Sequence, residues 1–179
     1  VSVDSSGVER NAQSLHPSIS ADGQVVAFHS LASNLVAGDT NRTWDVFVHD
    51  RATGITERVS VDSSGAEGND DSDWPSISAD GQIVMFSSHA SNLVAGDTNG
   101  DWDIFVHDRA TGVTERVSVD SSGGEGDWDS LGSSLSADGQ LVAFVSGASN
   151  LVAGDTNGTA DVFVHDRATG ITERVSVDS

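Results

Sequence analysis

The sequence predicts an all-β protein made of one short unit that is repeated three times. VSVDSSG begins at residues 1, 59 and 117, and other motifs such as SADGQ and HDRATG recur at the same spacing of 58 residues. Short apolar runs are separated by turn-forming Asp-Gly and Thr-Gly pairs, and no window has sustained helical periodicity. We therefore interpret residues 1–179 as a single repeat array, with repeats at 1–58, 59–116 and 117–174 and the start of a fourth at 175–179.

Each unit contains four predicted strands, and the second repeat shows the pattern. Residues 75–78 form a brief first strand, and an Ala-Asp-Gly turn leads to a second strand over residues 82–88. After a long loop, residues 103–107 form the third strand and residues 113–119 form the fourth. The two middle strands have continuous apolar cores, which is typical of strands covered on both faces. The fourth strand alternates apolar and polar residues, as a solvent-exposed strand at the edge of a sheet does.

Four antiparallel strands per repeat, buried in the middle and wet at the edge, describe a β-propeller blade. Residues 20–28 (SADGQVVAF) and 45–54 (DVFVHDRATG) resemble the bacterial PD40 or TolB-type WD40-like propeller repeats. Those repeats carry a Ser-Pro-Asp-Gly turn and an Asp-led apolar strand before a second turn. This sequence differs from them at Ala21, Ala79 and Ala137, where the family usually has proline, and in its longer SNLVAGDTN loop. The resemblance implies the fold, and propellers host many functions.

Three blades are too few to close a ring, because propellers use about four to eight. The fourth-strand motif also occurs once more than the others, since residues 1–4 supply a lone copy before the first repeat. We expect an open array unless other copies complete it. The array could continue in a longer chain, two chains could form a six-bladed ring, or chains could pair head to tail through exposed edges.

Composition excludes several classes of partner. With 8 basic and 28 acidic residues the formal net charge is −20, which argues against nucleic-acid binding and against anionic lipid surfaces. No apolar run is long enough for a membrane-spanning helix, so we expect no membrane insertion. The chain has no cysteine, which excludes disulfides and zinc-thiolate sites.

The long loops predict calcium sites, because oxygen-bearing side chains alternate along them as they do around a hard cation. The predicted ligands are Asp39, Asn41, Thr43 and Asp45 in the first repeat, Asp97, Asn99, Asp101 and Asp103 in the second, and Asp155, Asn157, Thr159 and Asp161 in the third. The pattern resembles the calcium loops of EF-hands and of FG-GAP repeats in integrin-type propellers, although Trp102 stands where an EF-hand needs glycine. The alternative is a metal-free loop of Asx turns. The second loop, with most carboxylates, is the strongest candidate.

Two tryptophans with acidic neighbours mark the segments that join one repeat to the next. Trp74 follows Asp73, and Trp128 follows Asp127, whereas the first repeat has neither tryptophan there. An exposed tryptophan beside carboxylates would suit a glycan or a partner protein. The alternative is a solvated acidic loop in which the tryptophan is buried and closes the blade junction. Trp44 and Trp102, directly before the third strand, are predicted to pack between blades.

No catalytic residues are predicted. The His49-Asp50 pair and its copies invite a catalytic interpretation, but adjacent strand residues point to opposite faces. Pairing of each aspartate with the arginine that follows it is the simpler expectation. The sequence has no nucleophile elbow, no zinc-protease motif and no phosphate-binding loop.

We predict an extracellular, calcium-stabilised, non-catalytic scaffold that assembles with further copies of itself or further repeats. An extracellular location follows from the millimolar calcium that such loops require. The alternatives are a glycan- or protein-binding module that uses the tryptophan-bearing junctions, and a non-catalytic propeller part of a larger enzyme.

Overall fold

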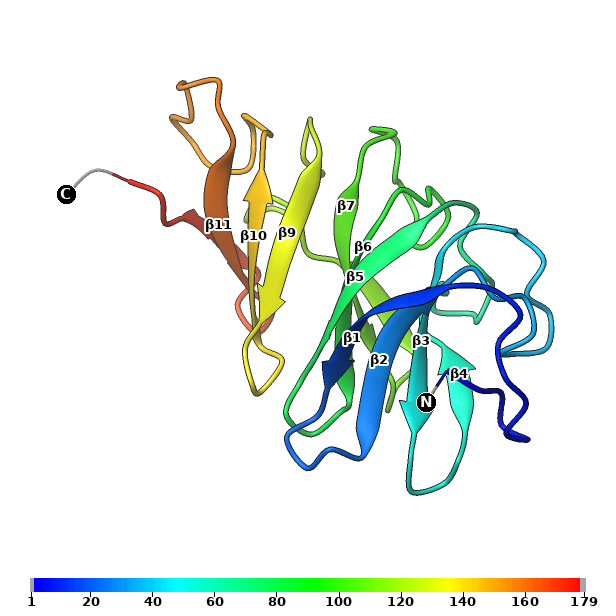
Figure 1. Cartoon of the computed structure of the whole chain (residues 1–179). Helices are drawn as coiled ribbons and strands as arrows, with labels where there is room; N and C mark the ends of the chain where they lie inside the picture. Colours follow the sequence, from blue (N-terminus) through cyan, green and yellow to red (C-terminus); the bar gives the residue numbers. More distant parts are fainter. Residues whose placement is uncertain (1, 178–179) are drawn as a thin grey trace.

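The computed structural model describes residues 2–177 and confirms an all-β fold of three four-stranded antiparallel sheets. The first blade contains β1 (Ser14–Ile19), β2 (Val25–Ser30), β3 (Asp45–Asp50) and β4 (Thr56–Arg58). The second contains β5 (Ser72–Ile77), β6 (Ile83–Ser88), β7 (Asp103–Asp108) and β8 (Val113–Arg116). The third contains β9 (Ser130–Leu135), β10 (Leu141–Ser146), β11 (Asp161–Asp166) and β12 (Ile171–Arg174). The blades stand side by side as an open array, with the first and third at opposite ends (Figure 1).

The two middle strands of each blade form its most regular part, as their continuous apolar runs predict. β6 and β7 pair along their whole length, from Ile83 opposite Asp108 to Ser88 opposite Asp103. The same register recurs between β2 and β3 and between β10 and β11. Phe86 and Phe105 lie opposite each other in this register and stack with ring centroids 6.0 Å apart.

The first strand of the second blade begins at Ser72, three residues before the predicted start at residue 75. A β-bulge between Asp73 and Ser76 interrupts its register with β6. Trp74 lies in this bulge with a φ of 50°, and His16 in the first blade has a φ of 46°. The third blade has Gly132 there, the residue that favours such a conformation. Because the bulge places a tryptophan where glycine is usual, the sequence pattern hid the first half of the strand.

The fourth strand ends at Arg116, and the predicted extension to residue 119 is wrong. Val119 instead forms a single bridge with Glu125, in the segment that leads to the third blade. The predicted lone strand at residues 1–4 is corrected in the same way: Val3 bridges only Glu9, and residue 1 lies outside the described residues. These VSVD segments are connectors between blades.

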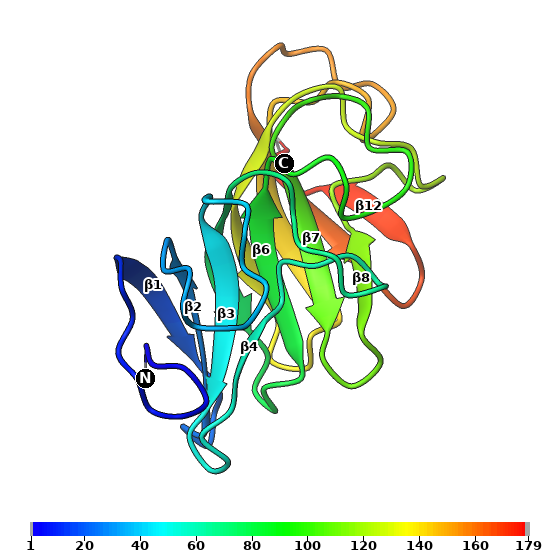
Figure 2. The ribbon, with the colours of Figure 1, turned by 90° about the vertical axis from the view of Figure 1, so that its right-hand side faces the viewer.

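Each connector covers the outer edge of the blade that follows it. The Thr114 hydroxyl donates to the Val61 carbonyl, at 2.5 Å. The Ser63 hydroxyl accepts the Thr114 backbone N–H, at 3.0 Å. The segment before the first blade makes the same contacts with Thr56 through Val3 and Ser5. These bonds satisfy the edge of the fourth strand (β4, β8 and β12 in Figure 2), which would otherwise be open to pairing with another chain.

The hydrophobic core lies mainly between blades. One cluster joins Val46 and Val48 of the first blade to Phe86 and Phe105 of the second. A second cluster joins Ile104 and other residues of the second blade to their counterparts in the third. A blade therefore buries its apolar face by packing on the next blade, as the sandwich-like layering of propellers requires.

Candidate functional site

The repeated motifs come together at the junctions between blades. At each internal junction, the backbone of one blade comes very close to a side chain of the preceding blade. The turn at Gly81 lies so close to Val25 of the preceding blade that a Cβ on Gly81 would be 2.8 Å from a valine methyl group. Gly139 lies over Ile83 in the same way, at 2.7 Å. A side chain at either glycine would push the blades apart, so the SADG motif is a packing motif as well as a turn.

Backbone hydrogen bonds connect the same turns from blade to blade. The Ala21 N–H donates to the Ala79 carbonyl at 2.9 Å, and the Ala79 N–H donates to the Ala137 carbonyl at 2.8 Å. Proline has no N–H to donate. This junction bond explains why the chain carries alanine where the similar repeats usually have proline.

Arginine–glutamate pairs also cross each junction. Arg109 Nε lies 2.5 Å from Glu57 Oε1 of the preceding blade, and Arg167 Nε lies 2.6 Å from Glu115 Oε1. The expected pairing of Asp108 with Arg109 is therefore wrong. Asp108 accepts the backbone N–H groups of Ala110 and Thr111 instead and stabilises its own turn.

Trp44 and Trp102 lie at the junctions, as predicted. The backbone N–H of Trp102 donates to the Asp129 carboxylate of the third blade at 2.9 Å, and the backbone carbonyl of Trp102 accepts the Ser130 N–H at 2.7 Å. Trp44 bonds to Asp71 and Ser72 in the same way. The third blade has Ala160 at this position, so its outer junction lacks the ring.

In the long loops, the predicted calcium ligands surround an arginine side chain. Arg116 Nη1 lies 3.3 Å from Asp97, 3.1 Å from Asp103 and 2.9 Å from Glu125. Glu125 belongs to the connector of the next blade, so this cluster also spans the junction. Sequence reasoning missed the arginine because it comes close to Asp103 only through the pairing of the third and fourth strands.

The same arrangement recurs in the other two loops. Arg58 lies 3.8 Å from Asp39, 3.3 Å from Asp45 and 2.8 Å from Glu67. Arg174 lies 2.8 Å from Asp155 and 3.2 Å from Asp161. The remaining predicted ligands stand outside these ion pairs; they are Asn41, Thr43, Asn99, Asp101, Asn157 and Thr159.

The loop asparagines form Asx turns. Asn99 Oδ1 accepts the Asp101 N–H at 3.2 Å, while its Nδ2 donates to Asp103 at 3.1 Å. The first and third loops repeat this pattern. Within residues 2–177, no group of three or more His, Asp or Glu side chains is arranged to hold a metal ion. The calcium sites stay a prediction.

Burial makes ionisation of several loop carboxylates costly. It raises the pKa of Asp39 to about 6, and nearby Asp45 adds to this effect while Arg58 opposes it. Burial likewise raises the pKa values of Asp97 and Asp101. In the second loop, the three carboxylates of Asp97, Asp103 and Glu125 carry more negative charge than Arg116 balances.

The His-Asp pairs make separate structural contacts. His107 Nδ1 lies 2.9 Å from the Thr114 hydroxyl, which itself bonds to the connector, and burial lowers the pKa of His107. Asp108 stabilises the turn on the other side of the strand. The two side chains therefore face different partners, as the strand geometry predicts.

Both tryptophans of the predicted partner-binding surface are exposed, so the alternative in which they are buried is wrong. Trp74 is 44 % exposed and Trp128 is 63 % exposed. They line two neighbouring hollows and do not form one site. Their acidic neighbours are already engaged: Asp73 lies 2.6 Å from His29 Nδ1, and Asp127 accepts the Ser149 N–H at 2.7 Å.

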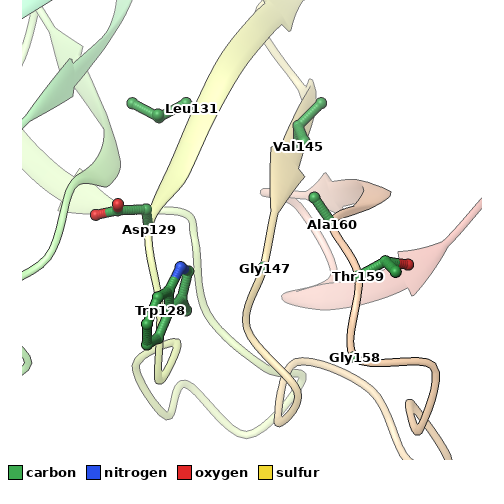
Figure 3. A pocket seen from close by; sticks show the side chains of 8 residues that line it. All are labelled: Trp128, Asp129, Leu131, Val145, Gly147, Gly158, Thr159 and Ala160. Atoms are coloured by element: carbon green, nitrogen blue, oxygen red, sulfur yellow. The ribbon is translucent and has the colours of Figure 1, made fainter.

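The hollow beside Trp128 lies on the outer face of the third blade, and none of residues 2–177 fills it. Its volume is about 490 Å³, and Leu131, Val145 and Ala160 are among the residues that line it (Figure 3). Trp128 lies against Gly147, where a Cβ would come within 2.7 Å of the indole. In the first two blades, Trp44 and Trp102 occupy the position of Ala160.

Comparison with solved structures confirms the fold of TolB-like β-propeller blades. TolB from Acinetobacter baumannii has a TM-score of 0.58 and 23 % identity, over 95 % of this chain and 33 % of that chain. The propeller domain of the Trilobed protease from Pyrococcus furiosus, described as having an open velcro topology, has a TM-score of 0.56 and 14 % identity over 91 % and 42 %. The chain spans about one third of the length of that TolB.

No protein-family model matches the sequence, and neither does any curated protein. Within the part of the chain that the structure describes, there is no helix long and apolar enough to cross a membrane.

The raised pKa of Asp39 predicts a pH dependence of stability. Its folded pKa of about 6 lies above the ordinary value of 3.8, so the folded protein binds more protons than the unfolded chain in this window. The free energy of unfolding should therefore fall as the pH rises from about 4 to about 6. Asp39→Asn should lessen this fall, measured by denaturant unfolding in EDTA. Asp22→Asn is the control, because the lowered pKa of Asp22 places its titration below the window. Equal slopes in wild type and Asp39→Asn would contradict the account.

Proposed function

We propose that this chain is a non-catalytic, extracellular scaffold that assembles with further blades through its open ends. Its repeated polar motifs support a structural role, because each is used within a blade or across a junction. His107 and Thr114 secure a connector, Arg109 pairs across a junction, and Arg116 gathers the loop carboxylates. A catalytic site needs one convergent set of different groups, whereas these contacts are copied from blade to blade.

One observation carries the assembly proposal: the face of the third blade that points away from the second is apolar and uncovered. Val46 and Ile104 are fully buried between blades, yet their counterpart Val162 is 37 % exposed. Leu141 is 44 % exposed, while its counterpart Val25 is only 8 % exposed. A contiguous apolar face on a secreted scaffold is best explained by a partner that covers it.

The proposal predicts self-association that depends on this face. Light scattering during gel filtration should give a mass above the 18.5 kDa of one chain. Val162→Asp should weaken the association, because it would bury a carboxylate without a partner. Ile171→Asp is the matched control, since Ile171 and its counterparts Ile55 and Val113 are all about half exposed. The mass of a single chain at every concentration would overturn the proposal.

Calcium binding at the second loop is part of the proposal. Asp97, Asp103 and Glu125 share one arginine there, Asp103 also repels the Asp101 carboxylate, and a cation would relieve this repulsion. The unfolding midpoint should rise by several degrees in millimolar calcium over EDTA or magnesium. Asp101→Thr should reduce the rise, and it copies Thr43 and Thr159 of the other loops. Equal midpoints in all three conditions would mean that Arg116 alone balances the loop.

A further inference from the structure

We propose that the hollow around Trp74 binds an organic cation, that is, a ligand or side chain that carries an ammonium or guanidinium group. The hollow lies where the first strands of the three blades, β1, β5 and β9, run side by side (Figure 1). Its volume is about 760 Å³, which is within the range of ligand sites in proteins. Its walls belong to the two junctions inside the array, so binding here does not depend on assembly with further blades.

Three equivalent positions, one in each blade, shape the hollow. His16 and Trp74 occupy this position in the first two blades, and Gly132 occupies it in the third. A Cβ built on Gly132 would meet only Val145, at 3.8 Å, so the glycine leaves open the space that a third ring would fill. The hollow therefore has aromatic rings on one side and free space on the other.

The backbone is strained at the two positions that carry rings. The φ angle is 46° at His16 and 50° at Trp74, close to the 59° of Gly132. Glycine adopts such an angle freely, whereas a bulky side chain rarely does. Strained residues of this kind cluster at binding sites and active sites, where the surrounding structure holds a side chain in a required place. A tryptophan kept here against the preference of its backbone indicates a role that glycine could not perform.

Trp74 belongs to a connected group of rings that crosses both internal junctions. The centroid of its ring lies 6.2 Å from that of His16 and 6.4 Å from that of Trp102. The rings are tilted against Trp74 by 35° and 40°. Trp74 is 44 % exposed, so a ligand in the hollow can reach its ring. An exposed indole is the side chain whose electron-rich face attracts a cation most strongly.

Carboxylates that lie beside these rings add a negative field. Asp73 directly precedes Trp74, and Asp101 directly precedes Trp102. Burial raises the pKa of Asp101, and the nearby Asp129 carboxylate raises it further. In the part of the chain that the structure describes, none of these three aspartates forms an ion pair with an arginine. Unbalanced negative charge around an aromatic hollow concentrates cations in it.

The polar groups of the hollow favour a cation over a sugar. Apart from the indole N–H, polar side-chain groups among its described lining residues are found only at His16 and Ser133. The Asp129 carboxylate is held by the backbone N–H of Trp102, at 2.9 Å, so it acts on a ligand mainly through its charge. A sugar would leave most of its hydroxyl groups without hydrogen-bond partners here. A methylated ammonium group needs no hydrogen bonds, because ring faces and charge attract it directly.

A ligand-observed NMR titration in EDTA tests the proposal with three probes. Choline carries the ammonium group, and the neutral alcohol in which carbon replaces its nitrogen has the same shape without the charge. Choline should bind saturably, and the alcohol should bind at least about fivefold more weakly. Added salt should weaken the binding of choline and leave that of the alcohol unchanged. The third probe, a short peptide with one lysine and one arginine, distinguishes a free cation from a side chain of a partner protein.

Trp74→Gly is the decisive variant, because it copies the residue that the third blade has at this position. Glycine suits the φ of 50°, so the unfolding midpoint should not fall below that of the wild type. The affinity for choline should fall at least about fivefold, because the indole face is lost. Trp74→Phe keeps a ring and should lose less, which provides a second test if the glycine variant folds poorly. Trp128→Leu is the matched control, since it removes an exposed indole that lines a different hollow, and the affinity should stay unchanged.

The outcomes are independent of those for assembly, which is measured by the mass of the particle. Choline binding that weakens in Trp74→Gly and in salt, but not in Trp128→Leu, supports the site. Tighter binding of the peptide than of choline, with the same loss in Trp74→Gly, supports the site and assigns the cation to a partner's side chain. Equal binding of choline and the neutral alcohol overturns the assignment of a cation. No saturable binding of any probe, or an unchanged affinity in Trp74→Gly, overturns the site.

Discussion

The burial of each blade's apolar face by the next blade is the interaction on which the rest of this structure depends. Val46 and Ile104 are fully buried only because another blade covers them, and the exposed Val162 marks where that cover ends. Burying such a side chain contributes about 1.5–3 kcal/mol. A single four-stranded sheet has too little interior to supply this term by itself, so the blades depend on one another.

The polar motifs fix the spacing and angle of that packing. The glycine of the SADG turn lets the backbone of one blade come close to a side chain of the preceding blade. The alanine N–H of the same turn donates to the alanine carbonyl of the following blade. Arg109 and Glu57 connect neighbouring blades at the other side of the turn. Arg116 and its carboxylates join the long loop to the connector of the next blade. Each repeat therefore carries groups that contact a preceding blade and groups that contact a following one.

Much of the fold could be predicted from the sequence, because a constant 58-residue spacing forces every unit into the same structure. The two middle strands of each blade were the most predictable, since their apolar runs are continuous. The bulge was not predictable, because Trp74 and His16 occupy positions where glycine would have signalled it. The end of the fourth strand was missed because valines continue into the connector, where Val119 forms a single bridge instead of extending the strand.

The candidate site was only partly predictable. The loop residues were found from their spacing, but calcium loops and Asx turns share that spacing, so the pattern could not decide between them. Arg116 lies thirteen residues beyond Asp103 and meets it only across paired strands. The exposure of the open faces could not be predicted either, because apolar strand residues look alike in the sequence whether or not another blade covers them.

Amide hydrogen exchange at low and high chain concentration tests most directly whether each blade is stabilised by the next. The account predicts that β10 and β11 exchange faster than β6 and β7 in dilute solution, because the back face of the third blade is then uncovered. At high concentration the third blade should become as protected as the second. Equal protection of the blades at every concentration would contradict the account.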